Sequence, residues 1–264
     1  MERVAFLFPG QGSQKVGMAL DLYESSRRVA ELYERASEAI DIDLAALSFE
    51  GPEEELTKTV NTQPALLVAG VAAMTLLLER GVEPWAVAGH SLGEYGALVA
   101  ARSLSLEDAV RAVRERGRLM YEAGLERPGA MAAVIGLDED AVGKVVREAA
   151  AAGVVQIANL NAPEQIVISG ETRAVREAMD IAAERGARRV IELKVSGAFH
   201  SELLEEARRG MESVLERIPF EKPQAVFVAN VTGGAVSDPV DIRRNLVDQV
   251  VRPVRWVECV RALV

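Results

Sequence analysis

One serine lies in a setting typical of an enzyme nucleophile: Ser91, in the stretch Gly89-His90-Ser91-Leu92-Gly93. The preceding residues 85–90, WAVAGH, predict a buried strand, and SLGEYGALVAA predicts a helix that starts at the serine. A strand-turn-helix with flanking glycines can expose the hydroxyl, and a helix N-terminal amide such as that of Leu92 can donate to a developing oxyanion. The alternative is that Ser91 only caps the helix.

A serine nucleophile needs a base, and the chain has only two histidines. His90 is expected to point away from Ser91, because adjacent side chains at the end of a strand face opposite sides. His200 lies in VSGAFHSELL, where a strand gives way to a helix, and is the expected base; a surface or capping histidine is the alternative. No acid stands out as a third member, so a Ser-His pair with the imidazole oriented by a carbonyl oxygen is the simpler expectation.

The helix expected over 105–123 carries the argument about the substrate. Its apolar residues gather in one stripe, and Arg111, Arg114 and Arg118 fall on the opposite face, whereas Arg116 falls at the edge of the stripe. An inward-facing guanidinium fits a carboxylate through two parallel hydrogen bonds. Arg116 could therefore bind a substrate carboxylate, with an internal salt bridge or a stem that reaches out to water as the alternatives.

Composition excludes several other functions. The chain has 264 residues, 49% of them hydrophobic, and a net charge of −10, which argues against a nucleic-acid partner. Neither a membrane span nor a signal peptide is expected, and the single cysteine, Cys259, suits a cytoplasmic protein. We expect no metal site. Gly10, Gly12 and Gly17 suggest a dinucleotide loop, but the spacing fails at Lys15, so NAD is not expected.

Strands alternating with helices predict an α/β fold with a largely parallel sheet. Residues 127–195 differ, because their patterns give the order βαββαβ, which is the order of a ferredoxin-like module. We therefore expect a large α/β subdomain over 1–126 and 196–264, with residues 127–195 as a small inserted subdomain.

Seven stretches are spread over nearly the whole chain: FPGQGSQ, NTQPAL (61–66), GHSLGEY (89–95), RGRLM (116–120), GAMAAVIGL (129–137), GAFHS (197–201) and DQVVRPVRW (248–256). In their order and spacing they resemble the malonyl-CoA:acyl carrier protein transacylases of fatty acid synthesis. The resemblance implies an α/β-hydrolase-like large subdomain with a ferredoxin-like insert. It also implies malonyl-CoA and acyl carrier protein as partners, with no cofactor beyond the CoA thioester.

The resemblance also implies a role for each matching residue. Ser91 would carry the acyl group, and His200 would act as base and then as acid. Arg116 would hold the malonyl carboxylate, a role that helical periodicity alone did not decide. The remaining roles are the oxyanion-hole amides of Gln11 and Leu92, orientation of His200 by Gln249, and pocket lining by Gln63 and by Phe199, whose bulk disfavours methylmalonyl units.

This chain departs from the family in three places. Ala198 and Glu202 stand where the family often has proline, so the backbone beside His200 could be looser. Family members usually continue with a further strand and a glycine-rich segment, whereas this sequence stops in an expected helix. A serine thioesterase, a silent scaffold that binds carrier protein and an acyltransferase domain of a polyketide synthase remain alternatives.

A basic stretch could attract the acidic carrier protein to an enzyme of net charge −10. Its members are Arg185, Arg188, Arg189 and Lys194. A plain solvated face is the alternative. A monomer is the simplest expectation for the oligomeric state.

Overall fold

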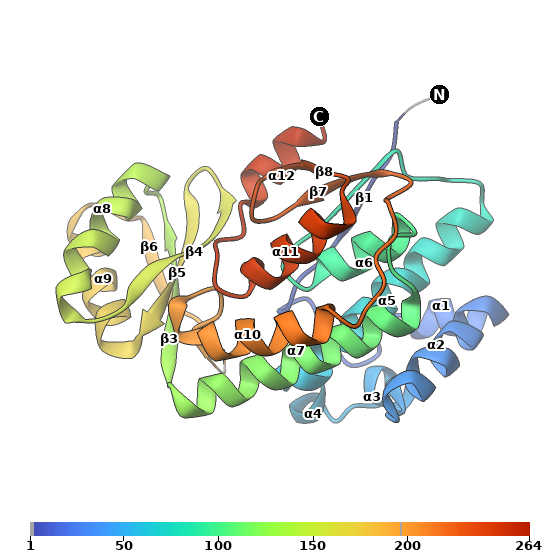
Figure 1. The fold of residues 1–264 in the computed structure, drawn as a ribbon. Helices are drawn as coiled ribbons and strands as arrows, with labels where there is room; N and C mark the ends of the chain where they lie inside the picture. The colour runs from blue at the N-terminus through green and yellow to red at the C-terminus, as the bar shows by residue number, and fades with distance from the viewer. Residues whose placement is uncertain (1–2, 196) are drawn as a thin grey trace.

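The computed structural model describes residues 3–195 and 197–264, and within them it has two separate four-stranded sheets (Figure 1). The helices cover these sheets, which confirms the expected mixed α/β fold with parallel strands. Ser196, at the expected boundary between subdomains, lies outside the described residues.

The first sheet has the order β1-β2-β7-β8. Its strands are β1 (Ala5–Phe8), β2 (Ala86–Gly89), β7 (Val226–Ala229) and β8 (Gly234–Val236). β1 pairs with β2 and β2 with β7 in parallel, whereas β8 runs antiparallel at the edge. Every residue of β2 is buried, as expected for a central strand covered on both faces. The carboxyl ends of the parallel strands therefore meet along one edge.

Long helices flank this sheet (Figure 1). α5 (Thr59–Glu79) packs against α7 (Leu106–Glu126) and α6 (Gly93–Ala100). By length and composition α5 could cross a membrane, but 56% of its most apolar stretch is buried inside the protein, as in a core helix. The other helices before residue 127 and after residue 196 are α1 (Leu20–Ser25), α2 (Arg27–Ile40), α3 (Leu44–Phe49), α4 (Glu53–Thr57), the 3₁₀ turn η2 (Glu202–Leu204), α10 (Glu205–Leu215), α11 (Pro239–Gln249) and α12 (Trp256–Ala262).

The second sheet is antiparallel and has the order β4-β5-β3-β6. In chain order its elements are β3 (Gly129–Ile135), α8 (Glu139–Ala149), η1 (Ala150–Ala152), β4 (Val155–Ala162), β5 (Gln165–Glu171), α9 (Thr172–Glu184) and β6 (Arg189–Glu192). α8 and α9 pack on one face and enclose a core of aliphatic side chains that is separate from the main core. The other face turns toward the large sheet (Figure 1).

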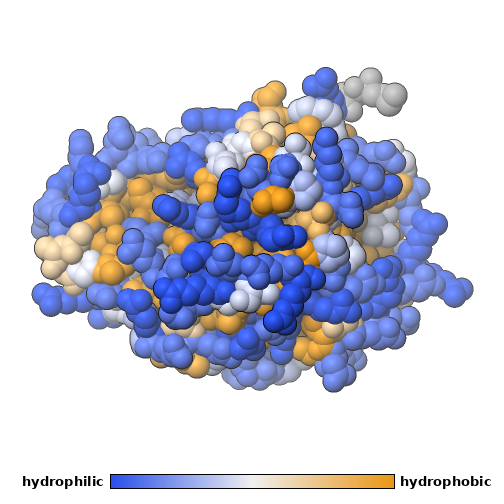
Figure 2. All heavy atoms as spheres, viewed as in Figure 1, coloured by the Kyte–Doolittle hydropathy of each residue, from blue (hydrophilic) through white to orange (hydrophobic). Residues whose placement is uncertain are grey.

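Local differences from the sequence expectations occur at element ends. α6 begins at Gly93 and not at Ser91, and the last strand of the second sheet covers only Arg189–Glu192 of the expected 187–195. Arg114 does not stand free in solvent as its helix face suggested, because its guanidinium donates to the carbonyl of Val60 at 2.9 Å. The face in Figure 2 is otherwise mostly hydrophilic, with hydrophobic side chains in scattered patches.

Candidate active site

Ser91 lies in the tight turn between β2 and α6 with φ of 52°, a left-handed conformation that is uncommon outside glycine. The glycines on both sides make the turn possible. A Cβ on Gly89 would come within 1.9 Å of the Gly93 backbone, and one on Gly93 within 2.4 Å of the Phe8 carbonyl oxygen. Ser91 is therefore not the helix cap but a strained residue at the carboxyl end of a central strand.

His200 contacts the serine hydroxyl: its Nε2 lies 2.8 Å from Ser91 Oγ. Its Nδ1 lies 2.8 Å from the main-chain carbonyl oxygen of Gln249. Because a carbonyl can only accept, Nδ1 carries the proton and Nε2 is left to accept from the hydroxyl. Burial, aided by the positive charge of Arg116, lowers the pKa of His200 to about 3, so the ring is neutral at pH 7.

Arg116 is only 1% exposed, yet no ion pair among the described residues includes it. Its Nη1 donates to Gln63 Oε1 at 2.9 Å, and its Nη2 donates to Gln249 Oε1 at 2.8 Å and to Ser91 Oγ at 3.0 Å. All three acceptors are neutral, and its Nε has no hydrogen-bond partner among residues 3–195 and 197–264. A buried guanidinium without a directly paired carboxylate is costly, so the site presents a positive charge at the serine.

Two backbone amides near the serine are free to bind an oxyanion. Within the described part of the chain, the main-chain N–H groups of Gln11 and Leu92 donate no hydrogen bond. The Gln11 side chain is tied elsewhere, since its Nε2 donates to Thr59 Oγ1 at 3.1 Å. Backbone amides without another acceptor are the groups that stabilise negative charge on a carbonyl oxygen.

A cavity of about 310 Å³ joins these groups. Ser91, His200 and Arg116 line it from the large sheet and its helices, and Asn159 and Asn161 line it from the second sheet. Phe199, Gln11 and Leu92 also line it. Gln63 and Gln249 do not line the cavity but bind Arg116, and Gln249 also contacts Ser91 and His200. A larger apolar cavity along β1 and α5 contains neither Ser91 nor His200, so volume alone would select the wrong place.

Two buried polar residues that the sequence analysis missed support the serine turn. Asn230, directly after β7, accepts from the Ser91 N–H at 2.8 Å and donates from Nδ2 to the Gly89 carbonyl at 2.8 Å. Its own main-chain N–H donates to Glu94 Oε1 at 2.7 Å. Asn230 therefore holds the strained turn directly, and Glu94 holds Asn230.

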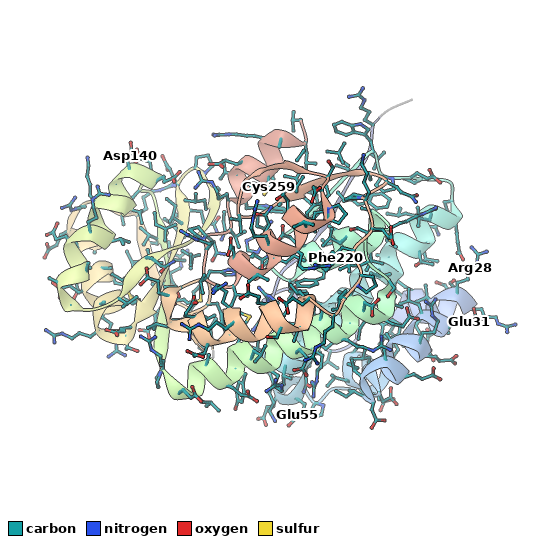
Figure 3. All side chains as sticks on the ribbon, viewed as in Figure 1. Arg28, Glu31, Glu55, Asp140, Phe220 and Cys259 are labelled. Carbon is teal, nitrogen blue, oxygen red and sulfur yellow. The ribbon has the colours of Figure 1, made fainter. Side chains whose placement is uncertain are left out.

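His90 also lines the cavity, but its ring is bound to a residue other than the serine. Its Nε2 lies 2.8 Å from Asn161 Oδ1, and its ring packs edge-on against Trp256 at a centroid distance of 5.5 Å. Burial lowers the pKa of His90. Cys259 is buried in α12 (Figure 3), and the described residues include no group of three or more side chains of the His, Cys, Asp and Glu types placed to hold a metal ion.

The four basic residues of the expected docking surface do not form one free patch. Arg185 pairs with Glu148, and Arg188 pairs with Glu164 at 3.1 Å. Arg189 and Lys194 take part in no ion pair within the described residues. Lys194 also lines the active-site cavity, so it is the member nearest to the chemistry.

Comparison with known proteins agrees with this geometry. The model of the acyl transferase domain matches residues 5–264. Malonyl CoA-acyl carrier protein transacylases from Bacillus subtilis and Escherichia coli K12 are each 44% identical, over 100% and 98% of this chain and 84% of theirs. The solved structure of the Coxiella burnetii transacylase superposes with a TM-score of 0.96 at 41% identity, covering 98% of this chain and 83% of that one.

A second solved structure shows a malonyl-transacylase in complex with a type II polyketide synthase acyl carrier protein. This chain is 43% identical to it, with a TM-score of 0.95 over 98% of this chain and 84% of that chain. A match over nearly the whole length at this identity shows the family and not the fold alone. The chain therefore belongs to the malonyl-CoA:acyl carrier protein transacylase family of acyl transferases.

Proposed function

We propose that this protein transfers the malonyl group of malonyl-CoA to the phosphopantetheine thiol of acyl carrier protein, through a malonyl ester on Ser91. The observation that carries the proposal is the position of Ser91 Oγ, which lies 2.8 Å from His200 Nε2 and 3.0 Å from Arg116 Nη2. The histidine is placed to act as the base that acyl transfer to a serine requires. The buried guanidinium beside the same oxygen favours an acyl group that carries a carboxylate.

In the first half-reaction, Ser91 Oγ attacks the thioester carbonyl carbon while His200 Nε2 takes the hydroxyl proton. The carbonyl oxygen becomes an oxyanion, and the amides of Gln11 and Leu92 are the donors available to it. Collapse of this intermediate breaks the C–S bond, and His200 returns the proton to the departing CoA thiolate. The second half-reaction repeats these steps with the carrier thiol as nucleophile and Ser91 as leaving group.

Arg116 holds the malonyl carboxylate during both half-reactions. Gln63 and Gln249 hold its guanidinium in place by accepting hydrogen bonds from Nη1 and Nη2. The Nε of Arg116 makes no hydrogen bond within the described residues that anion binding would have to break. An acetyl group would leave the buried guanidinium unpaired, and an unpaired buried charge costs on the order of several kcal/mol. Phe199, which is 7% exposed at the cavity wall, limits branching next to the thioester.

The test of this proposal is the intact mass of the protein after brief mixing with malonyl-CoA. One malonyl unit is expected on the wild type and none on Ser91→Ala, which removes only the attacking oxygen. Acetyl-CoA in a parallel reaction is expected to label the wild type far more slowly. Absence of an adduct from the folded wild type would contradict the proposed function.

The architecture that supports this chemistry is proposed as two subdomains. Residues 1–126 and 196–264 form an α/β-hydrolase-like large subdomain, and residues 127–195 form an inserted ferredoxin-like small subdomain. Their separate sheets and separate cores support this division. The reaction needs no cofactor or metal, and we place the protein in the cytoplasm as a monomer.

The carrier protein is proposed to dock beside the cavity, at Arg185, Arg188, Arg189 and Lys194. Arg188 and Arg189 are the pair to test, because neither lines the cavity. Changing both to glutamate is expected to raise KM for carrier protein about tenfold, with unchanged formation of the malonyl-enzyme, because rim charges act mainly on association. A charge reversal that leaves transfer to the carrier protein at the wild-type rate would remove this surface from consideration.

A further inference from the structure

Glu94 is a buried carboxyl group that the proposed reaction does not use. It lies in the first turn of α6, three residues after the nucleophile, and is 1% exposed. Its Oε1 accepts from the main-chain N–H of Asn230 at 2.7 Å, and its Oε2 accepts from the side-chain amide of Gln249. An acid in so apolar a helix is costly to bury, so its two contacts call for an explanation.

The side-chain amide of Gln249 joins Glu94 to Arg116. Both hydrogens of Gln249 Nε2 are used, one toward Glu94 and one toward the Ser91 carbonyl oxygen at 3.0 Å. The oxygen of the same amide accepts from Arg116 Nη2 at 2.8 Å. An amide can turn over and exchange its oxygen and nitrogen, so the neighbouring groups decide which end faces the arginine.

We propose that Glu94 is a positioning residue that fixes the Gln249 amide with its oxygen toward Arg116, so that selectivity for a carboxylated acyl group depends on Glu94. This inference rests on the proposed malonyl transfer. An ionised carboxylate can only accept, so it demands the NH₂ end of Gln249, and the guanidinium then meets the oxygen end. In its ionised form Glu94 also places a negative charge near the arginine without occupying the position of the substrate carboxylate.

The variant Glu94→Gln tests this arrangement because it changes one acceptor atom into a donor with almost no change in shape. The main-chain N–H of Asn230 cannot reverse, so the oxygen of the introduced amide is expected to stay with it. The NH₂ group of the introduced amide then faces Gln249 Nε2, and the Gln249 amide must turn to avoid two opposed donors. Turning presents an NH₂ group to Arg116, which loses an acceptor and shifts from its place beside Ser91.

The readout is the ratio of kcat/KM for acylation by malonyl-CoA to that by acetyl-CoA. We expect this ratio to fall about tenfold in Glu94→Gln, because only the malonyl group uses Arg116, whereas loss of the Gln249 bond to the Ser91 carbonyl oxygen affects both acyl groups alike. Tyr95→Phe, at the next residue along α6, is the matched control, because it removes a buried hydroxyl that has no hydrogen-bond partner in the described part of the chain. The ratio should stay at the wild-type value in this control. Equal loss for both acyl groups in Glu94→Gln would show a purely structural residue and would overturn the proposal.

The wild type gives a second measurement that does not depend on the folding of a variant. Burial raises the pKa of Glu94 to about 8, against the lowering effects of Asn230, Gln249 and Arg116. The other titratable or charged groups that face it are Arg116 from α7, Tyr95 from its own helix and Cys259 from α12. Burial raises the pKa of both Tyr95 and Cys259, so these two stay neutral between about pH 6 and pH 9. Burial lowers the pKa of Arg116, but a guanidinium in a protein keeps its proton.

The ionised form of Glu94 is the one that fixes the amide, and its fraction grows as pH rises through its pKa. The malonyl-to-acetyl ratio of the wild type is therefore expected to rise between about pH 6 and pH 9, and to be flat in Glu94→Gln. A wild-type ratio that does not change with pH would overturn the proposal. If the wild type instead forms no malonyl-enzyme at any pH, the proposed function has failed before this question arises.

Discussion

Replacement of His200 with alanine is expected to slow acylation of Ser91 by about 10⁴-fold, the upper range for loss of a general base. The reason is geometric, because the neutral Nε2 is the acceptor that lies 2.8 Å from the hydroxyl oxygen. Single-turnover acylation by malonyl-CoA, followed by intact mass, measures the rate directly. Because the CoA thiolate leaves readily, the rate should be lost in the attack of Ser91 on malonyl-CoA. The attack of the carrier thiol on the malonyl ester should be slowed as well.

The second histidine gives a matched comparison. His90→Gln keeps a polar partner for Asn161 but removes the imidazole, and its ring does not contact the serine hydroxyl. Its effect on acylation is expected to be small beside that of His200→Ala. If the two variants lose activity equally, or if His200→Ala retains a rate within about tenfold of the wild type, His200 is not the base.

Arg116→Met is expected to lower kcat/KM for malonyl-CoA by about 10²- to 10³-fold, the loss expected for a charge-assisted, two-point contact with a carboxylate. Methionine fills much of the space of the arginine side chain without its charge, so the acetyl-CoA rate should hold or rise. Selectivity is the quantity to measure, as the ratio of the two kcat/KM values.

Arg118→Met is the control for this second prediction. Arg118 lies two residues further along α7, is exposed and pairs with Glu115 and Glu122. Its loss is expected to leave selectivity unchanged, because exposed pairs on a helix contribute little. A wild-type ratio in Arg116→Met would mean that another group binds the malonyl carboxylate.

Residue chemistry alone identified the three groups that converge at the cavity. Ser91 has a local pattern, His200 follows from there being only two histidines, and Arg116 follows from helical periodicity. The fold class also follows from local alternation of strands and helices. These features can be predicted from sequence because each depends on a few neighbouring residues or on the number of residues of one type.

The supporting residues could not be read in this way. Asn230 and Gln249 reach Ser91 across more than a hundred residues of sequence, so no local pattern marks them, and Gln249 entered only through the family resemblance. Two weak signals existed: Glu94 is an acid in an apolar helix, and Asn230 directly follows a parallel strand. Polar residues at the carboxyl end of such strands gather at the same edge of the sheet as the nucleophile.

The start of α6 shows the limit of propensity. Serine is a good helix cap, and the sequence favoured a helix that begins there. The structure instead holds Ser91 at φ of 52°, with Asn230 bonding its N–H and Gln249 bonding its carbonyl oxygen. Tertiary hydrogen bonds thus impose a strained backbone that local preference would avoid, which is common at functional turns.

The most direct test of malonyl transfer is the fate of the isolated malonyl-enzyme. The acylated protein is freed of CoA and mixed with buffer alone or with acyl carrier protein that bears its phosphopantetheine, and the mass of both proteins is followed over time. Rapid loss of malonyl from Ser91 with equal gain on the carrier, and slow loss in buffer, is the expected result. Loss at the same rate with and without carrier protein would mean that water is the acceptor, and the chain would then be a thioesterase.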